Sequence, residues 1–228
     1  MAKKLERLTL KNQAEMALRE MIASYRFTPG KWINVEYLSK ELNVSRTPVW
    51  LALKDLEKEG LVIHTHGKGI RMAQMTLEMA NDLYTVRGLL EGLAASLASK
   101  KVTKMTLRRL DAILRKQEQT VKQGDVLEYS NSDFAFHAVL YESCGNWLLT
   151  ELLENIKARS RPFLCDITPI LKELYQDHMN VVEALRKNDA IRAEIIMKAH
   201  NKRMQDQIQW TIKTRERDDL HPVSEGTI

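Results

Sequence analysis

The apolar residues between positions 35 and 62 follow a helical period in two short segments, separated by a turn at 43–45. The second segment places four apolar residues three or four positions apart, on one helical face: Val49, Ala52, Leu53 and Leu56. Ser45 stands where a helix N-cap is expected, and Pro48 falls in the first turn, where its missing N–H costs no hydrogen bond. The pattern predicts two capped helices around a tight turn.

The segments on either side of this pair extend the pattern. Residues 10–25 predict another amphipathic helix, which ends before the breaker Thr28-Pro29-Gly30. Residues 61–63 and 70–72 are short strand-like runs, joined by a glycine-rich tip. The two helices alone would suit any helical hairpin, but three helices followed by a two-stranded wing predict a winged helix-turn-helix.

From residue 76 onward the apolar period is helical throughout. Helices are expected at 76–99, 103–123, 125–144, 146–161, 168–187 and 189–214. The predicted fold class is therefore mainly α, a winged helix-turn-helix at 1–75 followed by an all-α bundle of six or seven helices at 76–214. The polar stretch at 215–228 is predicted to be a flexible tail.

The net charge of +5 is concentrated at one end of the chain. Residues 1–75 hold 13 Lys and Arg against 8 Asp and Glu, whereas residues 76–228 hold 22 of each kind. A polyanion is the partner that such a distribution favours. The predicted partner is double-stranded DNA, with the second helix of the pair entering the major groove.

The residues predicted to face DNA lie outside the apolar stripe or at the tip of the wing. On the helix these are Arg46, Thr47, Trp50 and Lys54, and all four are expected to be exposed. At the wing, Gly67 permits close approach to the duplex and Lys68 supplies positive charge.

Cysteine usage and hydropathy favour a cytoplasmic protein without a membrane partner. The two cysteines, Cys144 and Cys165, form neither a disulfide framework nor a CxxC pair. No apolar run approaches 18 residues, and the first residues lack the apolar segment of a signal peptide.

Four polar residues fall on predicted inward faces of the bundle. Asp133 and His137 are four apart and share a helical face, and His178 and His200 lie among the apolar residues of two later helices. Each histidine alone fits a hydrogen-bonded residue of the core. Together, neutral imidazoles and a carboxylate suit a divalent transition metal, because bundle cores are where helices build such sites.

Two arginines are also expected to face inward. Arg87 lies between Leu83 and Leu90, with Glu91 one turn later, and Arg159 follows Leu152 and Ile156 on another helix. A structural ion pair between Arg87 and Glu91 would account for the first arginine. Alternatively, both guanidinium groups bind the carboxylate of a ligand.

The motifs of both halves resemble those of one family, the FadR-like branch of the GntR superfamily. In the first 75 residues the resemblance rests on Pro29-Gly30, the run 44–49, Ala52-Leu53, the run 59–62 and Gly67-Lys68-Gly69. In the bundle it rests on Arg87 with Glu91, Asp133 with His137, His178 and His200.

The resemblance implies a homodimer on a palindromic operator, controlled by a small organic acid effector. It also implies that Asp133 and the three histidines bind a divalent ion, with zinc preferred over nickel, manganese or iron. Arg46 and Thr47 would read bases, Ser45 and Lys54 would bind phosphates, and His66, Gly67 and Lys68 would belong to the wing. One departure is Trp50-Leu51, where the family usually has Arg-Glu.

The expected function is therefore that of a DNA-binding repressor whose operator affinity depends on a carboxylate bound at the metal. A regulator that senses the metal itself is the alternative. A metal-dependent enzyme is disfavoured, because no additional general base accompanies the four candidate ligands and the basic first third would have no use.

Overall fold

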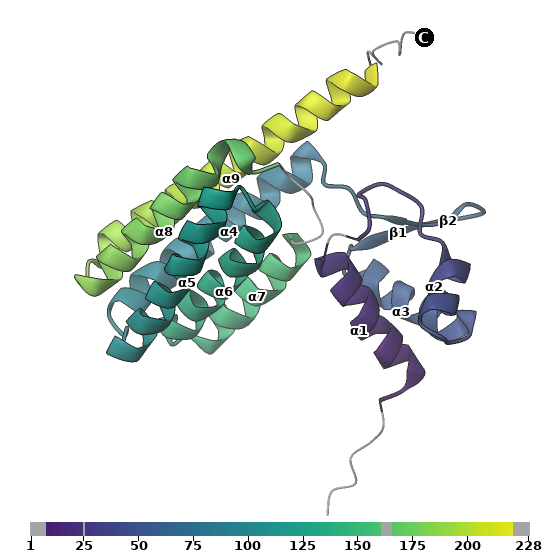
Figure 1. Ribbon diagram of the computed structural model, residues 1–228, viewed down its shortest axis with the longest axis horizontal. Helices are drawn as coiled ribbons and strands as arrows, with labels where there is room; N and C mark the ends of the chain where they lie inside the picture. The colour runs from purple at the N-terminus through teal and green to yellow at the C-terminus, as the bar shows by residue number, and fades with distance from the viewer. Residues whose placement is uncertain (1–7, 25, 161–165, 221–228) are drawn as a thin grey trace, which may run out of the picture. The chain divides into compact units, whose positions relative to one another are not determined.

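The computed structural model describes residues 8–24, 26–160 and 166–220, and Figure 1 shows the order of its elements. The chain forms two compact units, and the main division falls between Met75 and Thr76. The fold class is mainly α, as predicted. Among the described residues, no helix is both long enough and apolar enough to cross a membrane.

The first unit contains three helices and a hairpin: α1 (Leu10–Ala23), α2 (Val35–Glu41), α3 (Arg46–Lys58), β1 (Val62–Thr65) and β2 (Gly69–Met72). Its core is built from the predicted stripe of α3, whose four apolar residues are at most 1% exposed. Leu18 of α1 and Leu38 of α2 are buried in the same cluster. The three helices therefore share one apolar core.

The wing is an antiparallel pair in which Val62 lies opposite Met72 and Thr65 lies opposite Gly69. Trp32 forms a further bridge with Arg71, and the Ile33 N–H donates to the Ile70 carbonyl at 2.8 Å. The segment before α2 thus adds to the hairpin, which the sequence did not predict. This pairing fixes the wing to the helical core.

The caps of α2 and α3 differ. Asn34 Oδ1 accepts the Tyr37 N–H at 2.9 Å, which is the expected N-cap bond. Ser45 occupies the N-cap position of α3, as predicted, but its side chain makes no cap hydrogen bond. The exposed Ser45 side chain is left at the surface instead.

The second unit is helical in all the parts that are described. Its elements are α4 (Leu77–Ser99), α5 (Lys104–Gln123), α6 (Val126–Cys144), α7 (Trp147–Ser160), the 3-10 turn η1 (Thr168–Ile170), α8 (Leu171–Arg186) and α9 (Ala190–Leu220). Helices α4, α5, α6, α8 and α9 run alongside one another (Figure 1). The apolar core lies between them and includes Phe136, Leu140, Val181 and Met197.

Two glycines of α4 let it pack closely against α9. A Cβ at Gly88 would lie 3.4 Å from Asn201 Cβ, and one at Gly92 would lie 2.9 Å from Lys198 Cγ. The small residues bring Glu91, which lies between them on α4, near the side chains of α9. This close packing is one support of the site described below.

The helix boundaries agree with the predicted ranges to within a few residues, except at the end of the chain. Helix α9 continues to Leu220, beyond its predicted end at 214 and into the stretch predicted as a flexible tail. Residues 221–228 lie outside the described residues, as do Tyr25, position 161 and Cys165.

Candidate metal centre and nucleic-acid interface

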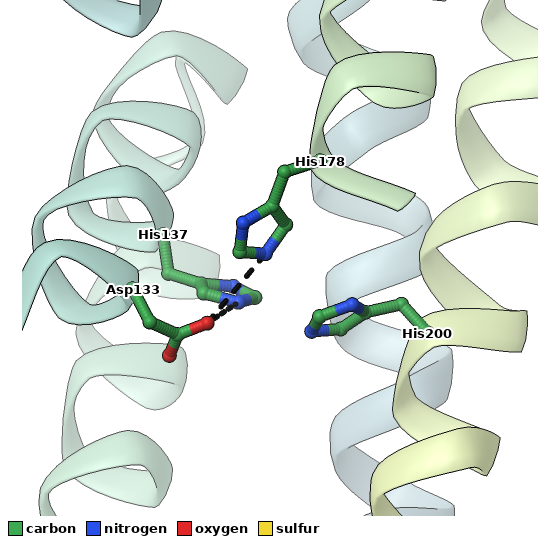
Figure 2. Close-up of side chains that lie close together, drawn as sticks. All are labelled: Asp133, His137, His178 and His200. Carbon is green, nitrogen blue, oxygen red and sulfur yellow. Dashed lines mark ion pairs between the residues drawn. The ribbon is translucent and has the colours of Figure 1, made fainter. Parts of the chain in front are cut away.

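Asp133, His137, His178 and His200 converge inside the second unit (Figure 2). Asp133 and His137 come from α6, His178 from α8 and His200 from α9. One potential ligand atom from each residue lies within 4.8 Å of the others. The three histidines are at most 1% exposed, so the centre of the cluster is shielded from water by protein.

The helical period explains why these side chains meet. Asp133 and His137 are one turn apart on α6, next to the buried Phe136 and Leu140. His178 lies on the face of α8 that buries Leu174 and Val181, while His200 lies on the face of α9 that buries Met197. Each polar residue therefore occupies a position that the helix directs into the core.

The two nitrogens of each histidine have different surroundings. His137 Nε2 and His178 Nε2 each lie 3.5 Å from Asp133 Oδ1, on the inner side of the cluster. The Nδ1 atoms of the three rings face oxygen atoms outside the cluster: Glu91 Oε1 at 3.1 Å from His137, Gln117 Oε1 at 3.0 Å from His178 and Asp177 Oδ2 at 3.6 Å from His200. For His137 and His178, an acceptor at Nδ1 favours the tautomer in which Nε2 keeps its lone pair, whereas His200 Nδ1 makes no hydrogen bond at its longer distance.

The charges of the cluster also suit metal binding. Burial lowers the pKa of His178 well below its ordinary value and lowers the pKa of His200 as well, so both rings are neutral at pH 7. Burial alone would raise the pKa of Asp133. The charge of Lys157 and the contacts with His137 outweigh burial and hold that pKa well below its usual range.

The unpaired atoms of the cluster provide a test of whether a metal fits. His137 Nε2 and His178 Nε2 are buried and have no hydrogen-bond partner. Buried polar atoms without partners are rare in proteins and call for an explanation. Three imidazoles and one carboxylate are a donor set that suits a divalent transition metal, and an ion would satisfy both orphaned nitrogens.

The carboxylate of Glu91 connects three helices around the cluster. Arg87 Nε donates to Glu91 Oε1 at 2.9 Å, and the Tyr141 hydroxyl donates to the same oxygen. Asn201 Nδ2 of α9 donates to Glu91 Oε2 at 2.5 Å. Arg87 and Glu91 are both buried, so the predicted ion pair exists and lies in direct contact with a candidate metal ligand.

The expectation that Arg159 faces inward is wrong. Its side chain is exposed, and so is that of Leu152, while Leu149, Leu153 and Lys157 form the buried face of α7. Leu152 and Arg159 have helical spacing, and so do Leu149, Leu153 and Lys157. Packing against the other helices buries the set that contains Lys157. Lys157 is therefore the inward-facing cation of α7, and its Nζ lies 2.5 Å from Asp133 Oδ2.

Lys157 was missed in the sequence, although it continues the stripe of Leu149 and Leu153 at a spacing of four. Burial, reinforced by the nearby charge of Arg87, lowers the pKa of Lys157 to about 8. Gln117 and Asp177 were missed as well. Nothing in their local pattern distinguishes them from solvated helix residues.

The surface predicted to contact DNA is formed by α3 and the tip of the wing. The exposed members are Ser45, Arg46, Thr47, Lys54, His66, Gly67 and Lys68. Arg46 extends from the first turn of α3, and its Nη2 lies 2.9 Å from Glu36 Oε2 of α2. With both side chains more than half exposed, this ion pair can exchange for a phosphate or a base at little cost.

Trp50 does not share this exposure, so the expectation of a fully exposed tryptophan is wrong. Its ring is half-buried against the core of the first unit and meets the ring of His64 edge to face, with centroids 5.7 Å apart. The large indole ring packs toward β1 because it buries apolar surface there. The neighbouring Leu51 remains 44% exposed.

A winged helix-turn-helix joined to an all-helical ligand-binding bundle defines a class of DNA-binding transcriptional regulators. The family model for bacterial regulatory proteins of the gntR family matches residues 10–72, and the FCD domain model matches residues 82–203. The chain belongs to the GntR family and carries an FCD domain.

The relatives of this chain are transcriptional regulators as well. The Nta operon transcriptional regulator of Aminobacter aminovorans is 32% identical over 85% of this chain and 91% of its own length. LutR of Bacillus subtilis, a helix-turn-helix transcriptional regulator, is 29% identical over 82% of this chain and 95% of its length. The protein is thus a transcriptional regulator and not an enzyme.

Solved structures agree on the fold. Escherichia coli McbR superposes with a TM-score of 0.77 at 20% identity, covering 90% of this chain and 99% of that structure. A GntR regulator from Rhodococcus superposes with a TM-score of 0.74 at 20% identity, covering 87% and 96%. Both likenesses concern the fold alone.

Proposed function

We propose that this protein is a repressor whose operator affinity is controlled by a small carboxylate bound at a divalent metal in the FCD domain. The observation that carries the proposal is the convergence of Asp133 and three histidines beside two buried cations, Arg87 and Lys157. Repression itself is supported by relatives such as the gluconate operon transcriptional repressor of Bacillus subtilis.

The charges around the cluster explain why an anion would bind. Among the described residues closest to Asp133, the two positive charges, on Arg87 and Lys157, are balanced by the negative charges of the Glu91 and Asp133 carboxylates. A divalent ion would add two buried positive charges, and buried charges are costly unless they are paired. An anionic ligand reduces this excess of positive charge, which favours carboxylates over neutral metabolites.

Asp133, His137, His178 and His200 would hold the ion, with zinc preferred and nickel, manganese or iron as alternatives. When bound, the ion would supply a Lewis-acid centre that can attract a carboxylate oxygen. Glu91, Gln117 and Asp177 orient the three rings. Arg87 and Lys157 provide the positive charge that orients the effector.

DNA binding is assigned to the first unit, acting as one half of a homodimer on a palindromic operator. Arg46 and Thr47 would contact base edges, while Ser45, whose hydroxyl makes no cap bond, and Lys54 would contact phosphates. His66, Gly67 and Lys68 would place the wing along the backbone of the duplex. The effector would act by binding more tightly to one relative arrangement of the two DNA-binding units.

A metal-sensing regulator is the second candidate, because the same four residues could report the metal concentration. Metal affinity separates the two functions. A protein that purifies with a full complement of tightly bound metal cannot sense that metal, whereas one that loses it on dialysis can.

The test begins with a duplex selected from a random library by the full chain, and with elemental analysis of the purified protein. Operator affinity is then titrated with acetate, L-lactate, succinate and citrate. We expect bound metal and at least one acid that weakens operator binding. His137→Ala should abolish metal binding and the response to acid while preserving operator binding.

Arg46→Ala is the complementary variant, because it leaves the metal centre intact. It should weaken operator binding by about 1–3 kcal/mol and leave the metal content unchanged. A protein that contains metal but responds to no acid would overturn the carboxylate proposal. A metal-free protein with full acid response would overturn the role of the metal.

A further inference from the structure

The outward face of α3 has an aliphatic side chain at its centre. Thr47, Leu51 and Lys54 are spaced four and three residues apart, so they follow one another along the same helical face. All three are exposed, and Leu51 exposes 44% of its surface. On this helix the neighbours of Leu51 one turn away are Thr47 and Pro48 on one side and Lys54 and Asp55 on the other.

Trp50, the residue before Leu51, is not fully exposed on the outward face of α3. Its ring is half-buried and packs toward His64 of β1, at a centroid distance of 5.7 Å. Leu51 is therefore the apolar side chain that α3 presents outward between the turn of Thr47 and the turn of Lys54. Any duplex that contacts Thr47 and Lys54 at once would therefore also face Leu51, which lies one turn from each of them.

The chemistry of the major groove indicates what this side chain would meet. Leucine has no donor or acceptor and cannot distinguish bases by hydrogen bonds. Thymine is the base that carries an apolar group, its C5-methyl, in the major groove. A leucine placed against the polar edge of another base would remove water from it without replacing the lost hydrogen bonds.

We propose that Leu51 packs against the C5-methyl group of a thymine, so that each half-site of the operator carries thymine at one fixed position. Leu51 is then a specificity-determining residue, and Arg46 with Lys54 supplies the charge attraction that brings it to the groove. The inference rests on the proposed binding of DNA by α3. An isolated exposed leucine is common on protein surfaces, so its position must be tested through the DNA.

The experiment uses the full chain and a duplex that it selects from a random library. Each thymine of one half-site is replaced in turn by deoxyuridine, which lacks only the C5-methyl group, and affinity is measured by fluorescence anisotropy. One position should weaken binding about fourfold, the value of burying one methyl group. Leu51→Ala should bind both versions of that position equally and keep the wild-type response at all others.

Met16→Ala is the matched control, because Met16 is an exposed apolar residue of α1, 60% accessible. This variant should reproduce the wild-type deoxyuridine profile. The role of Leu51 would be overturned if no deoxyuridine substitution weakened binding of the wild-type protein. It would also be overturned if Leu51→Ala lost affinity at the same position as the wild type. In either case operator binding itself would remain intact. Failure to select any preferred duplex would overturn the proposed DNA binding and this inference together.

Discussion

Glu91 Oε1 lies 3.1 Å from His137 Nδ1, while the opposite nitrogen of the same ring lies 3.5 Å from Asp133 Oδ1. The imidazole is thus held between two carboxylates that come from different helices. Burial would raise the pKa of Glu91, but the charge of Arg87 and the contacts with His137 hold it well below its usual range. An ionised Glu91 accepts a hydrogen bond from the Nδ1–H of His137 and leaves Nε2 as the candidate metal ligand.

Glu91→Gln should weaken metal binding about 10- to 100-fold, the usual effect of removing a partner behind a metal-binding histidine. It should also lower the free energy of unfolding by about 3–5 kcal/mol, because Arg87 would keep its buried charge without a counter-ion. Competition with a chelator and urea denaturation measure the two effects. Glu142→Gln, which changes an exposed glutamate paired with Arg109, is the control. Unchanged metal affinity in Glu91→Gln would refute the orienting role.

Lys157→Met should weaken carboxylate binding to the metal-loaded protein about tenfold or more. The variant removes a buried ammonium group beside Asp133, and hydrogen bonds to charged groups contribute about 1.5–3 kcal/mol. Isothermal titration calorimetry with the acid found active on the operator gives the affinity. Lys122→Met changes an exposed lysine paired with Glu118 and should have no effect. Equal affinities in the two variants would exclude Lys157 from the effector site.

Gly92→Leu should destabilise the second unit by about 1–3 kcal/mol. Its Cβ alone would lie 2.9 Å from Lys198 Cγ and 3.3 Å from Glu194 Cγ, so these side chains would have to leave their positions between α4 and α9. Urea denaturation and metal retention should both show the loss, because Glu91 and Asn201 meet across the same pair of helices. Val86→Leu on α4, where the side chain is 49% exposed, should leave both measurements unchanged. Wild-type stability in Gly92→Leu would show that the packing is not tight.

Glu59 should titrate below its ordinary pKa of 4.5 in the folded protein. The hydrogen bonds that Arg19 donates lower this pKa, so the pair stabilises the fold above pH 4.5, and that stabilisation is lost as the pH falls through the lowered value. An NMR titration of the Glu59 carboxyl carbon measures the shift. Arg19→Gln should return the pKa toward 4.5, and a pKa that stays low in this variant would point to another cause.

Local periodicity was sufficient to predict the helices of both units and the wing, because apolar stripes depend on positions a few residues apart. It also placed Asp133 and His137 on one face of α6. On α7, however, the helical period is compatible with two different buried faces. The prediction took the face that contains Arg159, whereas the folded protein buries the face that contains Lys157. Likewise, the half-burial of Trp50 depends on β1, which the period of α3 does not contain.

The sequence by itself determined the elements of this protein and its family, because helical spacing and turn residues are local properties of the chain. Only the tertiary structure decided which polar residues face the Nδ1 atoms of the candidate histidine ligands. Gln117 and Asp177 come from α5 and α8, and their contacts with His178 and His200 exist only after the helices pack. Their partners are set by packing across helices, which no spacing along a single helix encodes.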